Sequence, residues 1–210
     1  MDTKIAIITY NRPQELLRLT KELKGLDYVV IDDGSNYDSF IEDDRLVKLP
    51  HQGKKGFWLT YSVVIHNLLK SKADNYIILA DDFYNIDFDS VAEIHSRFRD
   101  DNYTVNMIND SRRSCWSSPR KWKTPKDMIN KGFFDCGGLT NRRTLQQIKL
   151  KEMPASWWTP NKSSGVGYQI TKQLKNKTKM FTPKQSLCKH GDAVSKMHPI
   201  ERIKNPLISI

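Results

Sequence analysis

The sequence predicts an α/β fold built on a mostly parallel sheet flanked by helices. Along residues 1–100, short apolar runs rich in β-branched residues alternate with segments whose apolar residues recur at helical spacing. This alternation is typical of parallel strands joined by crossover helices, which cover both faces of the sheet. Polar residues follow several of the apolar runs, and ligands bind at the carboxyl ends of the strands in such sheets.

The first half shows the alternation clearly. Residues 4–10, KIAIITY, form the first expected strand and end at NRP. Pro13 suits the first turn of a helix, and leucines then recur at intervals of three and four residues until Gly25 ends the pattern. The remaining expected elements of this half are strands over 27–35, 45–50 and 75–82 and helices over 57–71 and 87–101.

The second half is less regular and carries longer loops. A strand is expected over 104–109, and a basic loop over 111–127. Residues 132–148, GFFDCGGLTNRRTLQQI, predict a strand, a glycine turn and a helix in that order. The remaining expected elements are a loop over 156–167, a helix over 168–176, and a strand from 180 that leads into a tail.

Charge divides the chain into two halves of one domain. The net charge of +10 is the sum of −6 in residues 1–110 and +16 in residues 111–210, and four of the five tryptophans lie in the basic half. A basic half of this kind is either a solvated face or a surface for a polyanion, such as nucleic acid or an anionic membrane.

Several features favour a cytoplasmic protein without stable membrane insertion. No apolar run reaches about 18 residues, and the start of the chain lacks the pattern of a secretory signal. The three cysteines, Cys115, Cys136 and Cys188, are odd in number and far apart, which favours reduced thiols over a disulfide framework or a zinc site.

Two acid pairs stand where strands are expected to end. Asp81 and Asp82 follow YIILA, and carboxylates at a strand end are the hard oxygen ligands that Mg²⁺ or Mn²⁺ prefers. Asp32 and Asp33 follow YVVI, where a carboxylate can accept hydrogen bonds from a ribose or a base. The alternative interpretations are a solvated turn that caps the next helix and a tight Asp-Gly turn.

The segments IAIITYNRPQELLRLTKEL, YVVIDDGS and YIILADDF, in this order and spacing, resemble the nucleotide-sugar-binding half of GT-A glycosyltransferases similar to family 2. The resemblance covers roughly residues 3–100 and continues weakly through GGLTNRRTL. It implies a nucleotide-sugar donor, with a UDP-sugar expected, bound by residues 1–110, and an acceptor bound by residues 111–210.

The resemblance also assigns roles to residues in the first half. It implies that the donor nucleotide is lined by Thr9, Tyr10, Asn11 and Arg12, with Asp32 or Asp33 on the uracil or ribose, and Gly53 and Lys55 in a glycine-containing loop beside the donor. The ADD motif stands where the family has a DXD-like metal motif, although its first acid is missing. Asp82 then corresponds to the ligand of Mn²⁺ or Mg²⁺, and Asp81 to a contact with the sugar or ribose.

Further catalytic residues are expected in the second half. By the same resemblance, His190 is a candidate imidazole ligand of the metal, with His198 as a second option, and Lys196 would neutralise the departing diphosphate. An inverting transfer needs a carboxylate base, for which Asp135 in FFDCGG is the best-placed acid of this half. A retaining transfer would need no such base, and the sequence leaves the two open.

The basic half also predicts the acceptor. Arginine and lysine interleave with tryptophan in RRSCWSSPRKWK, a combination that suits phosphate contacts and base stacking. We expect the acceptor to be DNA, most specifically hydroxymethylated pyrimidines in phage DNA. The expected DNA-binding residues are Arg112, Arg113, Trp116, Arg120, Lys121, Trp122, Lys123, Trp157 and Trp158. The alternatives are an enzyme of cell-surface polysaccharide or lipopolysaccharide synthesis, and a nucleic-acid-binding module with a degenerate donor site.

Overall fold

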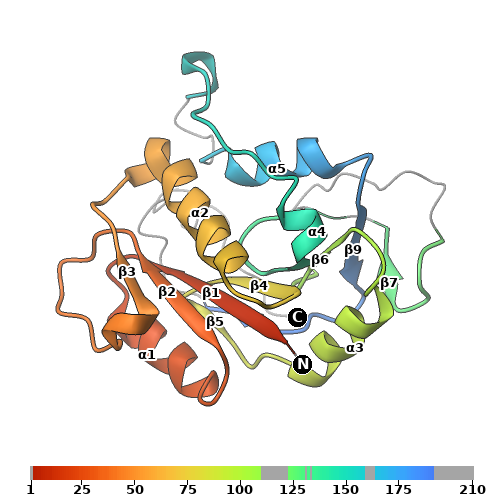
Figure 1. Cartoon of the computed structure of the whole chain (residues 1–210), viewed down its shortest axis with the longest axis horizontal. Helices are drawn as coiled ribbons and strands as arrows, with labels where there is room; N and C mark the ends of the chain where they lie inside the picture. Colours follow the sequence, from red (N-terminus) through yellow and green to blue (C-terminus); the bar gives the residue numbers. More distant parts are fainter. Residues whose placement is uncertain (1, 110–122, 131, 133, 159–163, 192–210) are drawn as a thin grey trace.

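The computed structural model describes residues 2–109, 123–130, 132, 134–158 and 164–191. Within these ranges the core is an eight-stranded sheet with the strand order β3-β2-β1-β4-β8-β6-β9-β7, flanked by helices on both faces (Figure 1). The predicted α/β fold with a mostly parallel sheet is confirmed.

The secondary structure follows the sequence pattern closely in the first half and less closely in the second. The strands of the main sheet are β1 (Thr3–Thr9), β2 (Tyr28–Asp32), β3 (Leu46–Lys48), β4 (Asn75–Ala80), β6 (Tyr103–Asn106), β7 (Met128–Ile129), β8 (Gly138–Asn141) and β9 (Lys179–Pro183). The helices are α1 (Pro13–Glu22), α2 (Gly53–Lys70), α3 (Phe88–Arg97), α4 (Arg142–Leu145) and α5 (Val166–Leu174), with short 3₁₀ turns η1 (Asp43–Arg45) and η2 (Ala155–Trp157).

Two strands of the sheet, β8 and β7, run against the direction of the others. Strands β3, β2, β1 and β4 run parallel, and β8 then pairs antiparallel with both β4 and β6. Because β8 runs against β4, the beginning of β8 lies at the same edge as the end of β4: Gly138 pairs with Ile78, and Gly137 donates a backbone hydrogen bond to the carbonyl of Ile78. Residues just before β8 therefore lie close to residues just after β4.

Alternate residues of each central strand pack into different layers. In β1, Ile5 and Ile7 face the layer that contains α1 and α3, whereas Ala6 and Ile8 face the layer that contains α2, α4 and α5 (Figure 1). The leucines of α1 that recur at helical spacing, Leu16 and Leu19, are at most 1% exposed. The continuous apolar runs of the central strands follow from this double coverage.

Of the predicted boundaries that differ from the structure, two affect candidate site residues. Helix α2 begins at Gly53 rather than at 57, so Gly53 and Lys55 lie in its first turn and not in a loop. Residues 134–137 form a bend, and β8 begins only at Gly138, so Asp135 precedes a strand instead of ending one. The sequence pattern could not place the start of β8, because Gly137 and Gly138 were expected to end a strand. In the structure these glycines instead allow Phe83 and Phe134 to pack closely against the beginning of β8.

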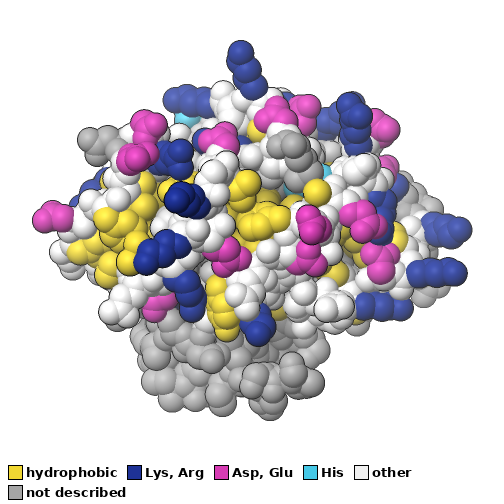
Figure 2. Space-filling view, turned by 90° about the horizontal axis from the view of Figure 1, so that it is seen from below, with side chains coloured by type: hydrophobic (Ala, Val, Ile, Leu, Met, Phe, Trp, Pro, Cys, Tyr) yellow, Lys and Arg dark blue, Asp and Glu magenta, His cyan; other side chains and the backbone are white. Residues whose placement is uncertain are grey.

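The outer face that α1 and α3 cover carries charges of both signs. Figure 2 shows acidic and basic side chains interspersed there, with apolar side chains between them. In the described part of the chain, no helix has the length and apolar character that crossing a membrane would require.

Gly137 provides a test of the packing around β8. Its φ is +84°, and a Cβ built there would lie 2.6 Å from the ring of Phe83, so Gly137→Ala should lower the free energy of unfolding by about 2–4 kcal/mol through backbone strain and overpacking. Gly25→Ala is the matched control, because its φ is +85° but no atom lies within 4 Å of the added Cβ. Urea unfolding of both variants measures the difference, and equal losses would contradict the packing contribution.

Candidate functional site

The carboxyl ends of three parallel strands meet at one edge of the sheet. Thr9 at the end of β1 pairs with Asp32 at the end of β2, and Ile8 pairs with Ala80 at the end of β4. Asp81 continues the same arrangement by donating its backbone N–H to the carbonyl of Ile8 at 3.1 Å. The two acid pairs that the sequence analysis identified therefore lie on either side of the end of β1.

Arg12 bridges the acid pair at the end of β4. Its Nη1 donates to Asp81 Oδ1 at 2.9 Å and to Asp82 Oδ2 at 2.8 Å. The three residues are 8%, 3% and 0% exposed, respectively, so the charges interact with little screening by water. Thr9 Oγ1 donates to the second oxygen of Asp81 at 2.8 Å. One guanidinium group thus compensates part of the repulsion between the adjacent carboxylates.

Burial changes the acidity of the pair. Removal from water raises the pKa of Asp81 to about 6, and the negative charge of Asp82 adds to this rise, while Arg12 and the hydrogen bond from Thr9 oppose it. Asp81 therefore loses its proton at about pH 6, whereas an ordinary aspartate does so near pH 4.

His190 lies against Asp82, as the sequence analysis expected. The two-stranded ribbon of β5 (Phe83–Tyr84) and β10 (Lys189–His190) places His190 opposite Phe83, directly after the acid pair. The Nε2 atom of His190 is 3.3 Å from Asp82 Oδ1, and the ring of Phe83 packs edge-on against the imidazole. The backbone N–H of Gly191 donates to the carbonyl of Asp82 at 2.7 Å, which fixes the approach of the two segments.

Asp82 and His190 form a close carboxylate–imidazole pair, and both side-chain types can coordinate a divalent cation. Adjacent ligands of an octahedral cation, each about 2.1 Å from the metal, lie about 3.0 Å apart. The observed separation of 3.3 Å is close to this value. Within the described ranges, no group of three or more His, Cys, Asp or Glu side chains is arranged to hold a metal. The remaining ligands would therefore be water and substrate oxygens, as is usual for Mg²⁺.

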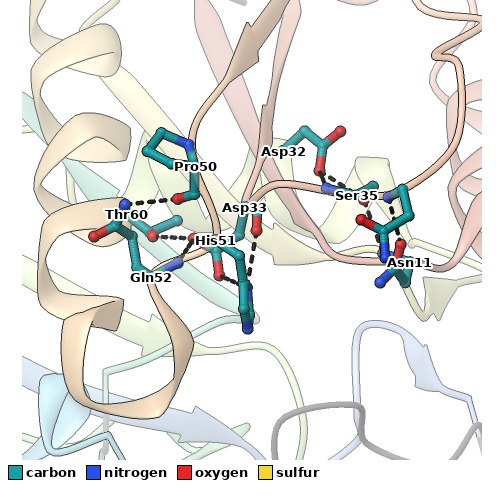
Figure 3. A network of polar contacts seen from close by, with 9 residues as sticks. Asn11, Asp32, Asp33, Ser35, Pro50, His51, Gln52 and Thr60 are labelled. Carbon is teal, nitrogen blue, oxygen red and sulfur yellow. Dashed lines mark hydrogen bonds and ion pairs between the residues drawn. The ribbon is translucent and has the colours of Figure 1, made fainter.

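Asp33, at the end of β2, is engaged by the protein through both carboxylate oxygens (Figure 3). Its Oδ1 accepts hydrogen bonds from Thr60 Oγ1 at 2.6 Å and from the backbone N–H of Gln52 at 3.2 Å, which caps the start of α2. Its Oδ2 lies 3.0 Å from Nδ1 of His51. These contacts attach the end of β2 to α2 and orient the imidazole of His51.

His51 is a site residue that the sequence analysis missed. Its ring stacks on Tyr10 with the centroids 3.9 Å apart and the planes 7° from parallel. Within the segment HQGKKG, the predicted donor residues were Gly53 and Lys55. The residue of this segment that contacts Tyr10 and Asp33 is its first, His51. The available signal was its position between the short strand β3 and α2, at the same edge of the sheet as the acid pairs.

Asp32 shapes the loops around the site. Its Oδ1 accepts hydrogen bonds from the backbone N–H of Ser35 at 2.9 Å and from Ser35 Oγ at 2.6 Å. Ser35 Oγ in turn accepts from the backbone N–H of Asn11, whose φ is +52°, and Asn11 Oδ1 accepts from the backbone N–H of Asn36. The loops after β1 and β2 are therefore joined to each other.

The other predicted residues that the structure describes differ in burial and in position. Asp135 is half-buried at the site edge because β8 starts there, and its Oδ1 accepts from the backbone N–H of Cys136 at 2.9 Å. Trp157 packs against Tyr168 with ring centroids 4.9 Å apart, Trp158 is half-buried, and Lys123 is exposed. Eight predicted residues lie outside the described residues: Arg112, Arg113, Trp116, Arg120, Lys121, Trp122, Lys196 and His198.

The raised pKa of Asp81 predicts a pH-dependent cost to stability. The folded protein holds a proton on Asp81 up to about pH 6, whereas the unfolded chain loses it near pH 3.8, so stability falls as pH rises between these values. A shift of about two units corresponds to about 3 kcal/mol. Asp81→Asn should therefore gain about 2–3 kcal/mol relative to the wild type on going from pH 4 to pH 7.5, measured by urea unfolding in EDTA. The exposed Asp89→Asn on α3 is the control; a pH-independent effect of Asp81→Asn would contradict the burial argument.

Comparison with known proteins finds similarity in structure. No protein-family model matches the chain, and neither does any curated protein sequence. The structure resembles A197 from STIV, with a TM-score of 0.51 and 17% identity over 90% of this chain and 84% of A197. It also resembles S. aureus TarS: with the 1–349 structure the TM-score is 0.59 at 14% identity, and with a longer TarS structure it is 0.57 at 13% identity.

The similarity to TarS covers 91% of this chain in both comparisons but only 61% and 37% of the two TarS chains. At such low identities it shows a common fold. The sheet order, the reversed strand β8 and these neighbours together establish a GT-A-like α/β architecture for this chain.

Proposed function

We propose that the protein is a metal-dependent glycosyltransferase that moves a sugar from a nucleotide sugar, with a UDP-sugar expected, to a hydroxyl acceptor. The observation that carries this proposal is the meeting of Asp82 and His190, 3.3 Å apart, beside Asp81 and Arg12 at the carboxyl edge of a GT-A-like sheet. The GT-A-like fold that this chain shares with TarS and A197 supports this class of reaction.

Each residue of the cluster has a separate task in this proposal. Asp82 and His190 would hold Mn²⁺ or Mg²⁺, which when bound would neutralise the negative charge that develops on the departing diphosphate. Arg12 holds both carboxylates in place by hydrogen bonds from a single nitrogen. Asp81, which Arg12 and Thr9 hold in place, would accept a hydrogen bond from a sugar or ribose hydroxyl of the bound donor.

The proton of the acceptor hydroxyl needs a destination if the transfer inverts configuration. We propose Asp135 as this base, because the reversed direction of β8 brings it to the edge of the sheet that carries the acid pair. Lys196 remains a proposed partner of the leaving diphosphate. A retaining enzyme would use the same metal and donor residues without this base.

As acceptor we propose DNA, with hydroxymethylated pyrimidines as the substrate base. The support is the net charge of +16 in residues 111–210, together with four tryptophans in that half. The mixed charges on the face of α1 and α3 favour a DNA-binding surface elsewhere on the molecule (Figure 2).

The metal proposal predicts a specific pattern of losses. Wild-type protein should hydrolyse or transfer from a UDP-sugar with Mn²⁺ and lose this activity in EDTA. Asp82→Asn and His190→Asn should each reduce the Mn²⁺-dependent rate by about 10²-fold, because each removes a ligand. Asp89→Asn, a matched change at an exposed position of α3, should leave the rate unchanged.

Nucleotide release, measured across a panel of UDP-, GDP- and CDP-sugars, provides the readout. Equal activity in EDTA and in Mn²⁺ would contradict the metal role but not glycosyl transfer. Absence of release with every donor, in the presence of saccharide and DNA acceptors, would contradict glycosyl transfer itself and favour a nucleic-acid-binding module.

The acceptor proposal predicts a covalent change in DNA. Incubation of hydroxymethylcytosine DNA with the protein, Mn²⁺ and the donor panel should add one hexose or pentose mass to the modified nucleoside, as seen by nucleoside mass spectrometry. Unmodified cytosine DNA is the control, because it lacks the accepting hydroxyl. Transfer to a saccharide or lipid-linked acceptor with no added mass on DNA would replace this acceptor with the polysaccharide-type alternative.

A further inference from the structure

His51 lies at the candidate donor site with its backbone firmly held. It follows β3, where Leu49 donates its backbone N–H to the carbonyl of Asp32 at 2.8 Å. On the other side, the chain passes so close to Gly34 that a Cβ there would lie 2.4 Å from the backbone nitrogen of His51. With φ of +82°, Gly34 adopts a conformation that allows this approach.

The surroundings of His51 determine which ring nitrogen carries the proton. Nδ1 lies 2.9 Å from the backbone carbonyl oxygen of Asp33 and 3.0 Å from its Oδ2. Both of these atoms accept hydrogen bonds, so Nδ1 must donate. In the neutral imidazole, Nε2 then carries a lone pair and acts as an acceptor. Asp33 is therefore a positioning residue that sets the tautomer of His51.

The direction of this acceptor is also fixed. Stacking on Tyr10, at 3.9 Å and 7°, holds the imidazole plane, and the lone pair of Nε2 lies in that plane. Figure 3 shows the far end of the ring turned away from the Asp33 network. The side chain is 38% exposed, so a ligand can reach it. The group thus presents one oriented acceptor beside Tyr10, at the place where the proposed donor nucleotide would bind.

We propose that His51 is a specificity-determining residue that selects the nucleobase of the donor by accepting a hydrogen bond at Nε2 from an imide N–H. This inference rests on the proposed function and identifies uracil as the base of the donor nucleotide. Uracil presents N3–H to such an acceptor, whereas cytosine presents a lone pair at N3 in the same position, and two lone pairs repel. The site therefore favours uridine over cytidine nucleotides.

The stacked arrangement also fixes the plane in which a base can pair. A base that pairs edge-on with Nε2 lies in the plane of the imidazole, which stacks face to face on Tyr10. Since Asp33 uses both carboxylate oxygens for His51, Thr60 and Gln52, its influence on the base passes through the imidazole.

Calorimetric binding of UDP and CDP in Mn²⁺ tests the inference without turnover, because neither nucleotide carries a sugar. Wild-type protein should bind UDP about tenfold more tightly than CDP, the size expected for one hydrogen bond gained in place of one lone-pair contact. His51→Phe keeps an aromatic ring for Tyr10 but removes the acceptor, so the UDP/CDP ratio should fall to about one. His51→Gln offers a side-chain carbonyl and should retain part of the preference.

His66→Phe is the matched control, since His66 is exposed on α2, and it should keep the wild-type ratio. Circular dichroism checks that each variant folds. If His51→Phe does not fold, the UDP/CDP affinity ratios of His51→Gln and of the wild type still test the role of His51. Equal affinities for UDP and CDP in the wild type, or a preserved preference in a folded His51→Phe variant, would overturn the role of His51 while leaving glycosyl transfer intact. Failure of the wild type to bind either nucleotide would instead overturn the proposed function, and this inference with it.

Discussion

One guanidinium nitrogen lies between two adjacent carboxylates at the end of β4. Arg12 Nη1 is 2.9 Å from Asp81 and 2.8 Å from Asp82, and all three groups are more than nine-tenths buried. Without this cation, two neighbouring negative charges would stand unscreened in the interior. Arg12 immediately precedes α1, so the start of that helix, the end of β1 and the end of β4 depend on the same ion cluster.

The two acid pairs have different tasks even though they look alike in the sequence. Asp33 uses its carboxylate to hold α2 and His51, and Asp32 uses one oxygen to hold the loop at Ser35. The pair at Asp81 and Asp82 instead faces Arg12 and His190, and burial raises the pKa of Asp81 to about 6. One pair therefore shapes the site, and the other supplies the negative charge that the proposed divalent cation would require.

Strand direction explains how distant residues reach this edge. Parallel strands bring the residues after β1, β2 and β4 together at one edge. The antiparallel strand β8 brings residues that precede it, including Asp135, to the same edge, and the antiparallel ribbon of β5 and β10 brings His190. Strands β8 and β10 both lie in the second half of the chain, where the sequence pattern was weakest.

The sequence by itself determined the α/β architecture, the central strands and the convergence of the acid pairs, because buried parallel strands have continuous apolar runs and their carboxyl ends must share an edge. It also indicated that Asp82 and His190 belong together. Tertiary structure decided what the sequence could not: that Arg12 bridges the acid pair, that Asp33 is used to orient His51, and that Asp135 precedes its strand. The contacts of Arg12, Asp81 and Asp33 join residues 18 to 72 positions apart, and no local pattern encodes which donor will reach which acceptor.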